Sequence, residues 1–397
     1  MNPAKQFHIA LIMHGGREWM GGVEYIRNLI LALANQPEDI RSTFDISLVC
    51  PPTIDPVLHS ELQPHLRRTY YYEKDFAQRT LVNRALWQYK RVALKRYNPK
   101  YDELVDRERF DFAFPHLDVR PNSRRSAHWI PDFQHKHLPH FFPESDIHKR
   151  DWMDSMAAYK AARVVFSSHA AKTDFQTFYP DATTRTEVLQ FKTSPHSLWF
   201  EGDPNAVQRQ YNLPERFFLI SNQFFQHKNH LLVFRALSLL KGAGVYPTVV
   251  CTGLVDDYRS PGFAQQIRSA IEDQDLTGQV HLLGLIPRLD QIQLMRQSLA
   301  VIQPSLFEGW STVMEDARCL GRPIIASDLP VNIEQSPPDC VYFPRESPEA
   351  LAARMQEWWE SKSPGPDMGR ELAAREQNKR DVQGYGQRFL EIARGNG

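Results

Sequence analysis

The chain has 397 residues, which is long for a single hydrophobic core, so the length predicts two domains. Its 47 Lys and Arg residues are balanced by 47 Asp and Glu residues, so the net charge gives no sign of a nucleic-acid partner and none is expected. Four cysteines, Cys50, Cys251, Cys319 and Cys340, lie far apart and form no CxxC pair, which argues against a zinc motif or a disulfide framework and indicates a reducing, cytoplasmic setting.

The first element is a short apolar run over residues 8–13, which predicts a buried strand. It is followed by glycines, among them the pair Gly21-Gly22, and then by apolar residues at helical spacing from Val23 onward. Strand, glycine loop and helix form the opening of a βαβ unit. The apolar run is too short for a signal peptide, and no stretch of about 18 apolar residues predicts a membrane-spanning helix.

The stretch 67–100 is strongly basic, with ten Lys or Arg residues against two acidic ones, and it also contains several Tyr and Trp residues. One interpretation is a solvated helix face whose aromatic residues contact the core. The other is a basic surface for an anionic acceptor or for a membrane.

Strand signals return at 110–114, 127–130 and 163–167, and a segment rich in Ser, Pro, Gly and Asp then separates the two halves of the chain. The second half alternates plainly, with strands expected at 217–221, 246–252, 280–283, 300–303 and 323–326 and helices at 230–241, 263–273, 289–298 and 312–320. Unbroken apolar strands that alternate with helices predict a parallel sheet covered on both faces, and therefore an α/β fold. We expect domains over residues 1–195 and 196–375, with the helical segment 375–397 as a candidate to pack back onto the first domain.

The most informative segment lies between the strand that ends near Gln303 and the helix that begins near Ser311 and Thr312. Ligands bind at the carboxyl ends of strands in parallel sheets, and a helix N-terminus there suits a diphosphate. Gly309 lets the backbone come close to a ligand, and Glu308 can accept hydrogen bonds from sugar hydroxyls.

The same segment contains Glu308-Gly309-Trp310, seven residues between the first acid and Asp316, and then Gly321-Arg322-Pro323. This pattern resembles the signature of retaining glycosyltransferases of family 4, the group 1 family, which have the GT-B fold of two Rossmann-like domains facing a central cleft. The resemblance implies that Glu308 holds the transferred sugar and that Asp316 holds the ribose. The second acid of the family is usually Glu, so Asp316 is a departure, and Glu315 beside it is an alternative.

A second match to the family lies at residues 221–230. There the family supplies an Arg and, five residues later, a Lys that neutralise the diphosphate. Lys228 occupies the Lys position, but Gln223 occupies the Arg position, so a bidentate phosphate contact is missing. Arg288 and His227 are candidates to replace it. By the same resemblance, Gly21-Gly22 borders the donor phosphates, and the loop with Ile286 receives the base.

The segment 128–141 is dense in histidine and aromatic residues. The family often has His-Asp here, with the His near the reacting carbon, but this chain has Pro131 before Asp132. His135 is the best substitute as the catalytic histidine, and His128 and His137 are alternatives. No cysteine or carboxylate set supports a metal site at these histidines.

Together these matches imply a metal-independent hexosyltransferase that uses a UDP or GDP sugar as co-substrate and no bound cofactor. The acceptor would be a glycan, as in polysaccharide biosynthesis, or a lipid-linked sugar. The expected location is the cytoplasm, with peripheral association at the inner face of the membrane as an option. Two alternatives remain: a nucleotide-sugar epimerase of the same fold, and a non-catalytic carbohydrate-binding scaffold.

Overall fold

The computed structural model describes residues 6–13, 15, 20–72, 89, 99–120, 123–255, 260 and 262–395. The contacts divide the chain into two compact units. The first unit comprises Met1–Phe133, His148–Ser194 and Arg380–Gly397, and the second comprises Gln134–Ile147 and Pro195–Lys379. The segment Gln134–Ile147, which the sequence places in the first domain, thus makes most of its contacts with the second unit.

The first unit contains two parallel sheets. One has the strand order β3-β2-β1-β4, and the other has the order β5-β6-β7. The strands are β1 (Phe7–Ile12), β2 (Phe44–Cys50), β3 (Arg68–Tyr71), β4 (Phe112–Phe114), β5 (His128–Ile130), β6 (Arg163–Phe166) and β7 (Arg185–Val188). An isolated parallel bridge between Ala113 and Ser126 links the two sheets.

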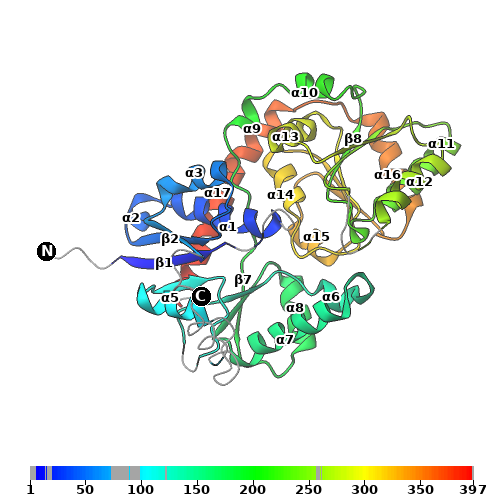
Figure 1. Cartoon of the computed structure of the whole chain (residues 1–397). Helices are drawn as coiled ribbons and strands as arrows, with labels where there is room; N and C mark the ends of the chain where they lie inside the picture. The colour runs from blue at the N-terminus through cyan, green and yellow to red at the C-terminus, as the bar shows by residue number, and fades with distance from the viewer. Residues whose placement is uncertain are drawn as a thin grey trace. The chain divides into compact units, whose positions relative to one another are not determined.

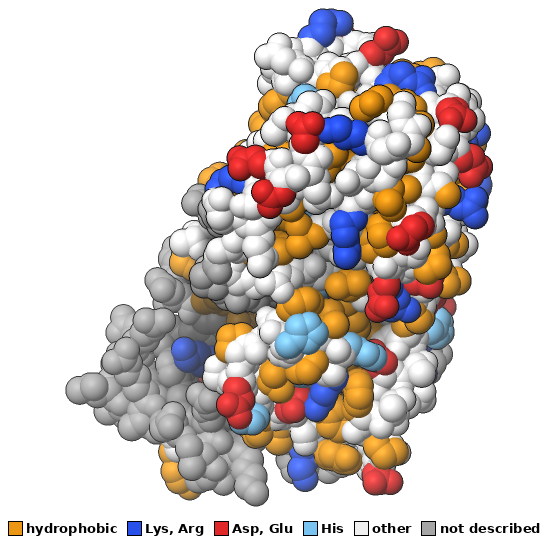
Figure 2. Space-filling view, turned by 90° about the vertical axis from the view of Figure 1, so that its right-hand side faces the viewer, with side chains coloured by type: hydrophobic (Ala, Val, Ile, Leu, Met, Phe, Trp, Pro, Cys, Tyr) orange, Lys and Arg blue, Asp and Glu red, His pale blue; other side chains and the backbone are white. Residues whose placement is uncertain are grey.

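Helices cover these sheets with apolar side chains. They are α1 (Met20–Ala34), α2 (Glu38–Arg41), α3 (Pro56–Leu62), η1 (Gln63–His65), α5 (Pro99–Arg107), α7 (Glu144–Lys160), which begins in the second unit, and α8 (His169–Phe178). Leu104 and Val105 of α5 pack on Ala10 and Ile12 of β1. Most of the basic stretch 67–100 lies outside the described residues. On the face drawn in Figure 2, the basic and acidic side chains of the described residues are interspersed.

The last helix, α17 (Met368–Arg394), belongs to both units, because the division falls between Lys379 and Arg380. Its second half lies beside α1 (Figure 1), where Gln36 Nε2 donates to the carbonyl of Gln383 over 2.9 Å. Phe389 makes edge contacts with Phe112 and Phe114 of β4, at centroid distances of 6.0 and 5.3 Å. The end of α17 therefore completes the core of the first unit.

The second unit is built on one parallel sheet with the order β10-β9-β8-β11-β12-β13. Its strands are β8 (Phe218–Ser221), β9 (Val249–Thr252), β10 (Val280–Gly284), β11 (Val301–Gln303), β12 (Ile324–Ser327) and β13 (Cys340–Phe343). Its helices are α6 (Gln134–His137), η2 (Pro139–Phe141), α9 (Leu198–Glu201), α10 (Pro204–Gln210), η3 (Gln226–Lys228), α11 (His230–Gly242), α12 (Phe263–Asp273), α13 (Arg288–Gln297), α14 (Thr312–Cys319), α15 (Pro330–Gln335) and α16 (Pro348–Ser361).

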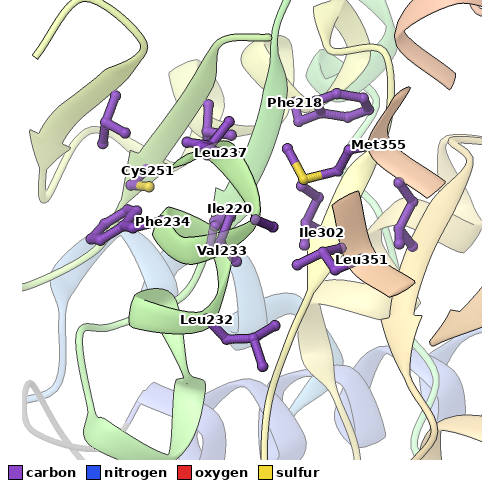
Figure 3. Close-up of a cluster of buried hydrophobic side chains, with 14 of the residues drawn as sticks. Phe218, Ile220, Leu232, Val233, Phe234, Leu237, Cys251, Ile302, Leu351 and Met355 are labelled. Atoms are coloured by element: carbon purple, nitrogen blue, oxygen red, sulfur yellow. The ribbon is translucent and has the colours of Figure 1, made fainter. Parts of the chain in front are cut away.

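Successive residues of these strands enter opposite cores, as strand geometry requires. Phe218 and Ile220 face the core made by α11, α12 and α16, which Figure 3 shows in close-up. Phe217 and Leu219 face the core made by α13 and α14. In Figure 1 these two groups of helices lie on opposite sides of β8. The α/β class and the doubly covered parallel sheet predicted from the sequence are confirmed.

Candidate functional site

The carboxyl ends of the second unit's strands carry the residues that the sequence singled out. Because all six strands are parallel, the loops after β8, β9, β10, β11 and β12 leave the same edge of the sheet. The loop after β11 is joined to the loop after β8 by a hydrogen bond from Leu306 N–H to the carbonyl of His227, over 2.7 Å. This bond holds together two loops that are far apart in the sequence.

Lys228 and Glu308 meet at this junction. Lys228 Nζ lies 2.6 Å from Glu308 Oε1, and the side chains are 17% and 8% exposed. The next residue, Asn229, has a left-handed backbone with φ 59° and donates to the carbonyls of Pro304 and Arg345. The chain therefore reverses sharply after Lys228, and its ammonium group is held against the loop that carries Glu308.

Three donors converge on the same oxygen of Glu308. Besides Lys228, Gln303 Nε2 and Ser305 Oγ each donate to Oε1 over 2.7 Å. Gln303 is held in turn by Asn222 Nδ2, which donates to its Oε1 over 2.9 Å. The carboxylate is thus fixed by buried neighbours, as a ligand-orienting group requires. Sequence reasoning missed Gln303 and Asn222, although polar residues at the ends of buried strands are a usable signal.

Asp316 lies on α14 and pairs with Arg288 at the start of α13. Arg288 Nη2 lies 2.6 Å from Asp316 Oδ2; the arginine side chain is 41% exposed and that of Asp316 is 3% exposed. The neighbouring Glu315 is fully buried and accepts from Gln335 Nε2 over 2.9 Å. Glu315 therefore serves the packing of α14 on α15, and Asp316 is the acid that reaches the carboxyl edge.

Arg288 is positioned by further contacts that sequence reasoning missed. Its guanidinium lies over the ring of Trp199, 5.1 Å from the centroid, and its Nη1 donates to Gln291 Oε1 over 2.7 Å. Gln291 Nε2 donates in turn to Ser221 Oγ at the end of β8. A polar chain therefore runs from α14 through α13 to the central strand.

The start of α14 is capped by its own sequence. Ser311 Oγ accepts from Met314 N–H over 3.3 Å, while the N–H and carbonyl of Ser311 bond to the amide of Gln335. Gly309, Trp310 and Thr312 are half-buried around this turn. The side chain of Ser311 therefore caps the N-terminus of α14 rather than pointing toward a ligand.

Gln223 and Ile286 lie on neighbouring loops at the same edge. Gln223 is half-buried, and a side chain at Gly253 would lie only 2.9 Å from its backbone nitrogen. Gly253 N–H donates to the carbonyl of Gly284 over 2.8 Å, so the loops after β8, β9 and β10 are stacked closely. Ile286 packs against the α13–α14 core, while Leu285 is 78% exposed.

The glycine pair of the first unit is placed differently from the prediction. Gly21 and Gly22 lie in the first turn of α1, which begins at Met20, and not in the loop before the helix. Neither has a positive φ, whereas Gly15 does, at 96°. Both glycines are part of the helix, so it begins three residues before Val23.

The predicted acceptor-side residues fall in both units. Asp132 follows β5 in the first unit, and His135 lies in α6 of the second unit with a nearly inaccessible side chain. His137 of the same short helix contacts Phe307, with ring centroids 5.2 Å apart. The histidine segment is therefore attached to the loop that carries Glu308.

A buried cluster in the first unit has the residue types of a metal site. Asp102, His116 and Asp118 each offer a ligand atom within 4.8 Å of the others. Arg120 already donates to both carboxylate oxygens of Asp118, so a guanidinium supplies the positive charge there. Burial alone would raise the pKa of Asp118, but hydrogen bonds from Arg120 and Ser123 outweigh burial and keep that pKa below its ordinary value. The cluster is an ion-pair network.

The fold is shared with solved GT-B glycosyltransferases, and the carboxyl-edge site lies within the part of the chain that a family model matches. Residues 205–379 match the family model described as Glycosyl transferases group 1, so the second unit carries a group 1 glycosyltransferase domain. The enzyme class predicted from the sequence is confirmed. No curated protein matches the sequence.

Solved structures of low sequence identity share the fold over nearly the whole chain. The Anabaena protein Alr3699/HepE, in complex with UDP and glucose, is 16% identical with a TM-score of 0.64, covering 98% of this chain and 99% of its own. Sucrose-phosphate synthase from Thermosynechococcus elongatus is 16% identical, TM-score 0.64, with coverages of 99% and 98%. A glycosyltransferase from Rickettsia africae is 14% identical, TM-score 0.63, with coverages of 98% and 97%. Among the described residues, no helix is long and apolar enough to cross a membrane.

Proposed function

We propose that this chain transfers a sugar from a nucleoside diphosphate sugar to a hydroxyl of a glycan or lipid-linked acceptor, with retention at the anomeric carbon. The observation that carries the proposal is the Lys228–Glu308 pair at the carboxyl edge of the group 1 domain. It combines a cation for the leaving diphosphate with a buried, fixed carboxylate for the sugar. No metal ion enters the reaction.

Uridine is the first base to test. Solved structures of Alr3699/HepE, which share this fold, contain UDP and UDP-glucose. The guanosine nucleotide is the alternative. The loop of Ile286 would contact the base mainly through its backbone, so its side chains do not reveal which base is bound.

Departure of the diphosphate is the chemical difficulty, since negative charge develops on its oxygens. Lys228 and the N-terminus of α14 would stabilise that charge, which is catalysis by preorganised electrostatics. Glu308 would orient the sugar for attack, and Asp316 would hold the ribose. The acceptor hydroxyl would attack from the face that the diphosphate leaves, and its proton would pass to the leaving phosphate. His135 and Asp132 are our candidates for the acceptor side.

We place the reaction in the cytoplasm, at the inner face of the membrane when the acceptor is lipid-linked. The basic stretch 67–100 is the sequence feature that favours an anionic or membrane-bound acceptor. Gln223, which stands where a cation is expected, is the feature that favours a non-catalytic carbohydrate-binding protein instead.

The first experiment measures thermal stabilisation by UDP, GDP and their glucose conjugates. A ligand that binds only the folded state at about 100 times its Kd adds about 2.7 kcal/mol, so one base should raise the melting temperature clearly. Lys228→Ala should abolish the shift and lower the rate of sugar transfer by about 100-fold or more. Glu308→Gln should keep nucleotide binding but lose transfer.

Lys241→Ala is the matched control, because Lys241 also pairs with a carboxylate, that of Asp275, but lies at the end of α11. It should behave as the wild type. Donor consumption without acceptor, giving a new sugar epimer, would indicate an epimerase. Nucleotide binding without any turnover would indicate the binding protein.

A further inference from the structure

The carboxyl edge of the second unit carries a second ion pair whose two partners differ sharply in exposure. The Asp316 carboxylate is covered, at 3% exposed, while its partner Arg288 is 41% exposed. One oxygen of Asp316 is taken by Arg288 over 2.6 Å. A ligand approaching this place therefore meets the guanidinium before the carboxylate.

The guanidinium is held in one orientation before any ligand arrives. Asp316 accepts from Nη2, Gln291 accepts from Nη1 over 2.7 Å, and the guanidinium carbon lies over the Trp199 ring, 5.1 Å from its centroid. Trp199 is itself buried. Groups fixed in this way lose little conformational entropy on binding, which favours their use as ligand contacts.

Exposed apolar side chains also occur on the loops of this carboxyl edge. Leu285 and Leu254 are 78% and 43% exposed on the loops after β10 and β9, which a hydrogen bond from Gly253 to Gly284 joins. Leu289, next to Arg288, is 41% exposed. An edge that carries both a fixed cation with polar neighbours and exposed apolar side chains suits a nucleoside, which has a hydroxylated sugar and a flat apolar base, better than a free inorganic anion.

We infer that Arg288 is a donor-binding residue that contacts the ribose hydroxyls together with Asp316. This inference rests on the proposed function. Asp is one methylene shorter than the Glu that the family pattern has here, and Arg288 occupies one of its oxygens, so the carboxylate alone has a reduced reach. The five N–H donors of the guanidinium extend the pair toward the hydroxyls, which can accept from Arg288 and donate to Asp316.

The test compares UDP with 2′-deoxy-UDP by isothermal titration calorimetry, with GDP and 2′-deoxy-GDP in parallel. In the wild-type protein, loss of the 2′-hydroxyl should weaken binding about tenfold or more, the value of one hydrogen bond to a charged group. Arg288→Ala should weaken the ribonucleotide to the same extent and erase the difference between the two sugars. Arg288→Lys, which keeps a cation beside buried Asp316, should retain only part of the difference.

Arg370→Ala is the matched control. Arg370 is 44% exposed and pairs with Asp339 over 2.9 Å, but Asp339 precedes β13 at the opposite edge of the sheet. This variant should bind both nucleotides as the wild type does. If folded Arg288→Ala and Arg288→Lys both keep the wild-type preference for ribose, the inference is overturned.

A longer acid provides an independent check. In the Arg288→Ala background, Asp316→Glu should restore ribonucleotide binding, because the added methylene recovers reach that the arginine supplied. In the wild-type background the same change should bring no gain. Failure to rescue would contradict the inference. If the wild type binds none of these nucleotides, the proposed function itself fails, whereas binding that needs Lys228 but not Arg288 overturns only the role of Arg288.

Discussion

At the scale of single residues, His230 shows how the donor loop is anchored. It begins α11, is fully buried, and stacks on Phe224 with ring centroids 4.2 Å apart and an angle of 13°. Within the described part of the chain neither of its ring nitrogens has a hydrogen-bond partner. Burial, and secondarily the charge of Lys228, lower the pKa of His230 to about 3.

His230→Phe should therefore stabilise the protein, and more so in acid. Unfolded His230 takes up a proton as the pH falls through about 6.5, while the folded residue stays neutral until about pH 3, so stability is lost between these values. At pH 5 the phenylalanine variant should gain about 2 kcal/mol over its advantage at pH 8. Urea unfolding at both pH values measures this gain. An equal advantage at both would show that folded His230 takes up a proton at pH 5 as readily as the unfolded residue does.

At the scale of elements, two glycines of α17 test how its second half packs. A Cβ at Gly386 would lie 2.6 Å from the carbonyl oxygen of Ala32 in α1, whereas a Cβ at Gly384 would meet nothing within 4 Å. Both glycines are helical, so they differ in packing rather than in backbone conformation. This pair separates helix propensity from the contact between two helices.

Gly384→Ala should stabilise the protein by about 0.5–1 kcal/mol, because alanine loses less backbone entropy in a helix. Gly386→Ala should destabilise it despite the same gain, since overpacking typically costs about 1–3 kcal/mol. Thermal melts of the two variants side by side measure the difference. Equal stabilisation by both substitutions would mean that α17 does not rest on α1.

The central elements of the second unit were predictable from sequence because strands β8, β9, β11 and β12 are buried on both faces. Helices α11 to α14 and strands β8 to β12 were found within a few residues. Strand β13 was missed, although its burial is close to that of β10, which was found; what β13 lacks is a longer apolar run in the sequence. At the site, Glu308, Lys228 and Asp316 were singled out by the resemblance to the family pattern. Arg288 and Gln303 were recognised as partners only in three dimensions, because ion pairs and amide contacts across many residues leave no periodic signal.

At the scale of the whole molecule, the chain contributes to its two units in alternation. The first unit takes its last piece from residues after Arg380, and the second takes an early piece from Gln134–Ile147. Phe389 is fully buried against β4, while Phe343 is fully buried in the second unit's core. These two phenylalanines allow the units to be perturbed separately.

Phe389→Ala should cost the first unit about 3–5 kcal/mol, as expected for a large cavity in a packed core. Amide hydrogen exchange should then accelerate in β1 and β4 while β8 and β9 remain protected. Phe343→Ala should produce the reverse pattern. If either variant accelerates amide exchange in the strands of both units, the two units unfold as one.

The shared helix α17 also has a consequence for biosynthesis. A polypeptide emerges from the ribosome from its N-terminus, and domains generally fold as they appear. Here the rings of Phe112 and Phe114 lack their contact with Phe389 until late in synthesis, because Phe389 is made after the entire second unit. The unit that is begun first is thus finished last, and the nascent chain carries an uncovered aromatic surface through most of its translation.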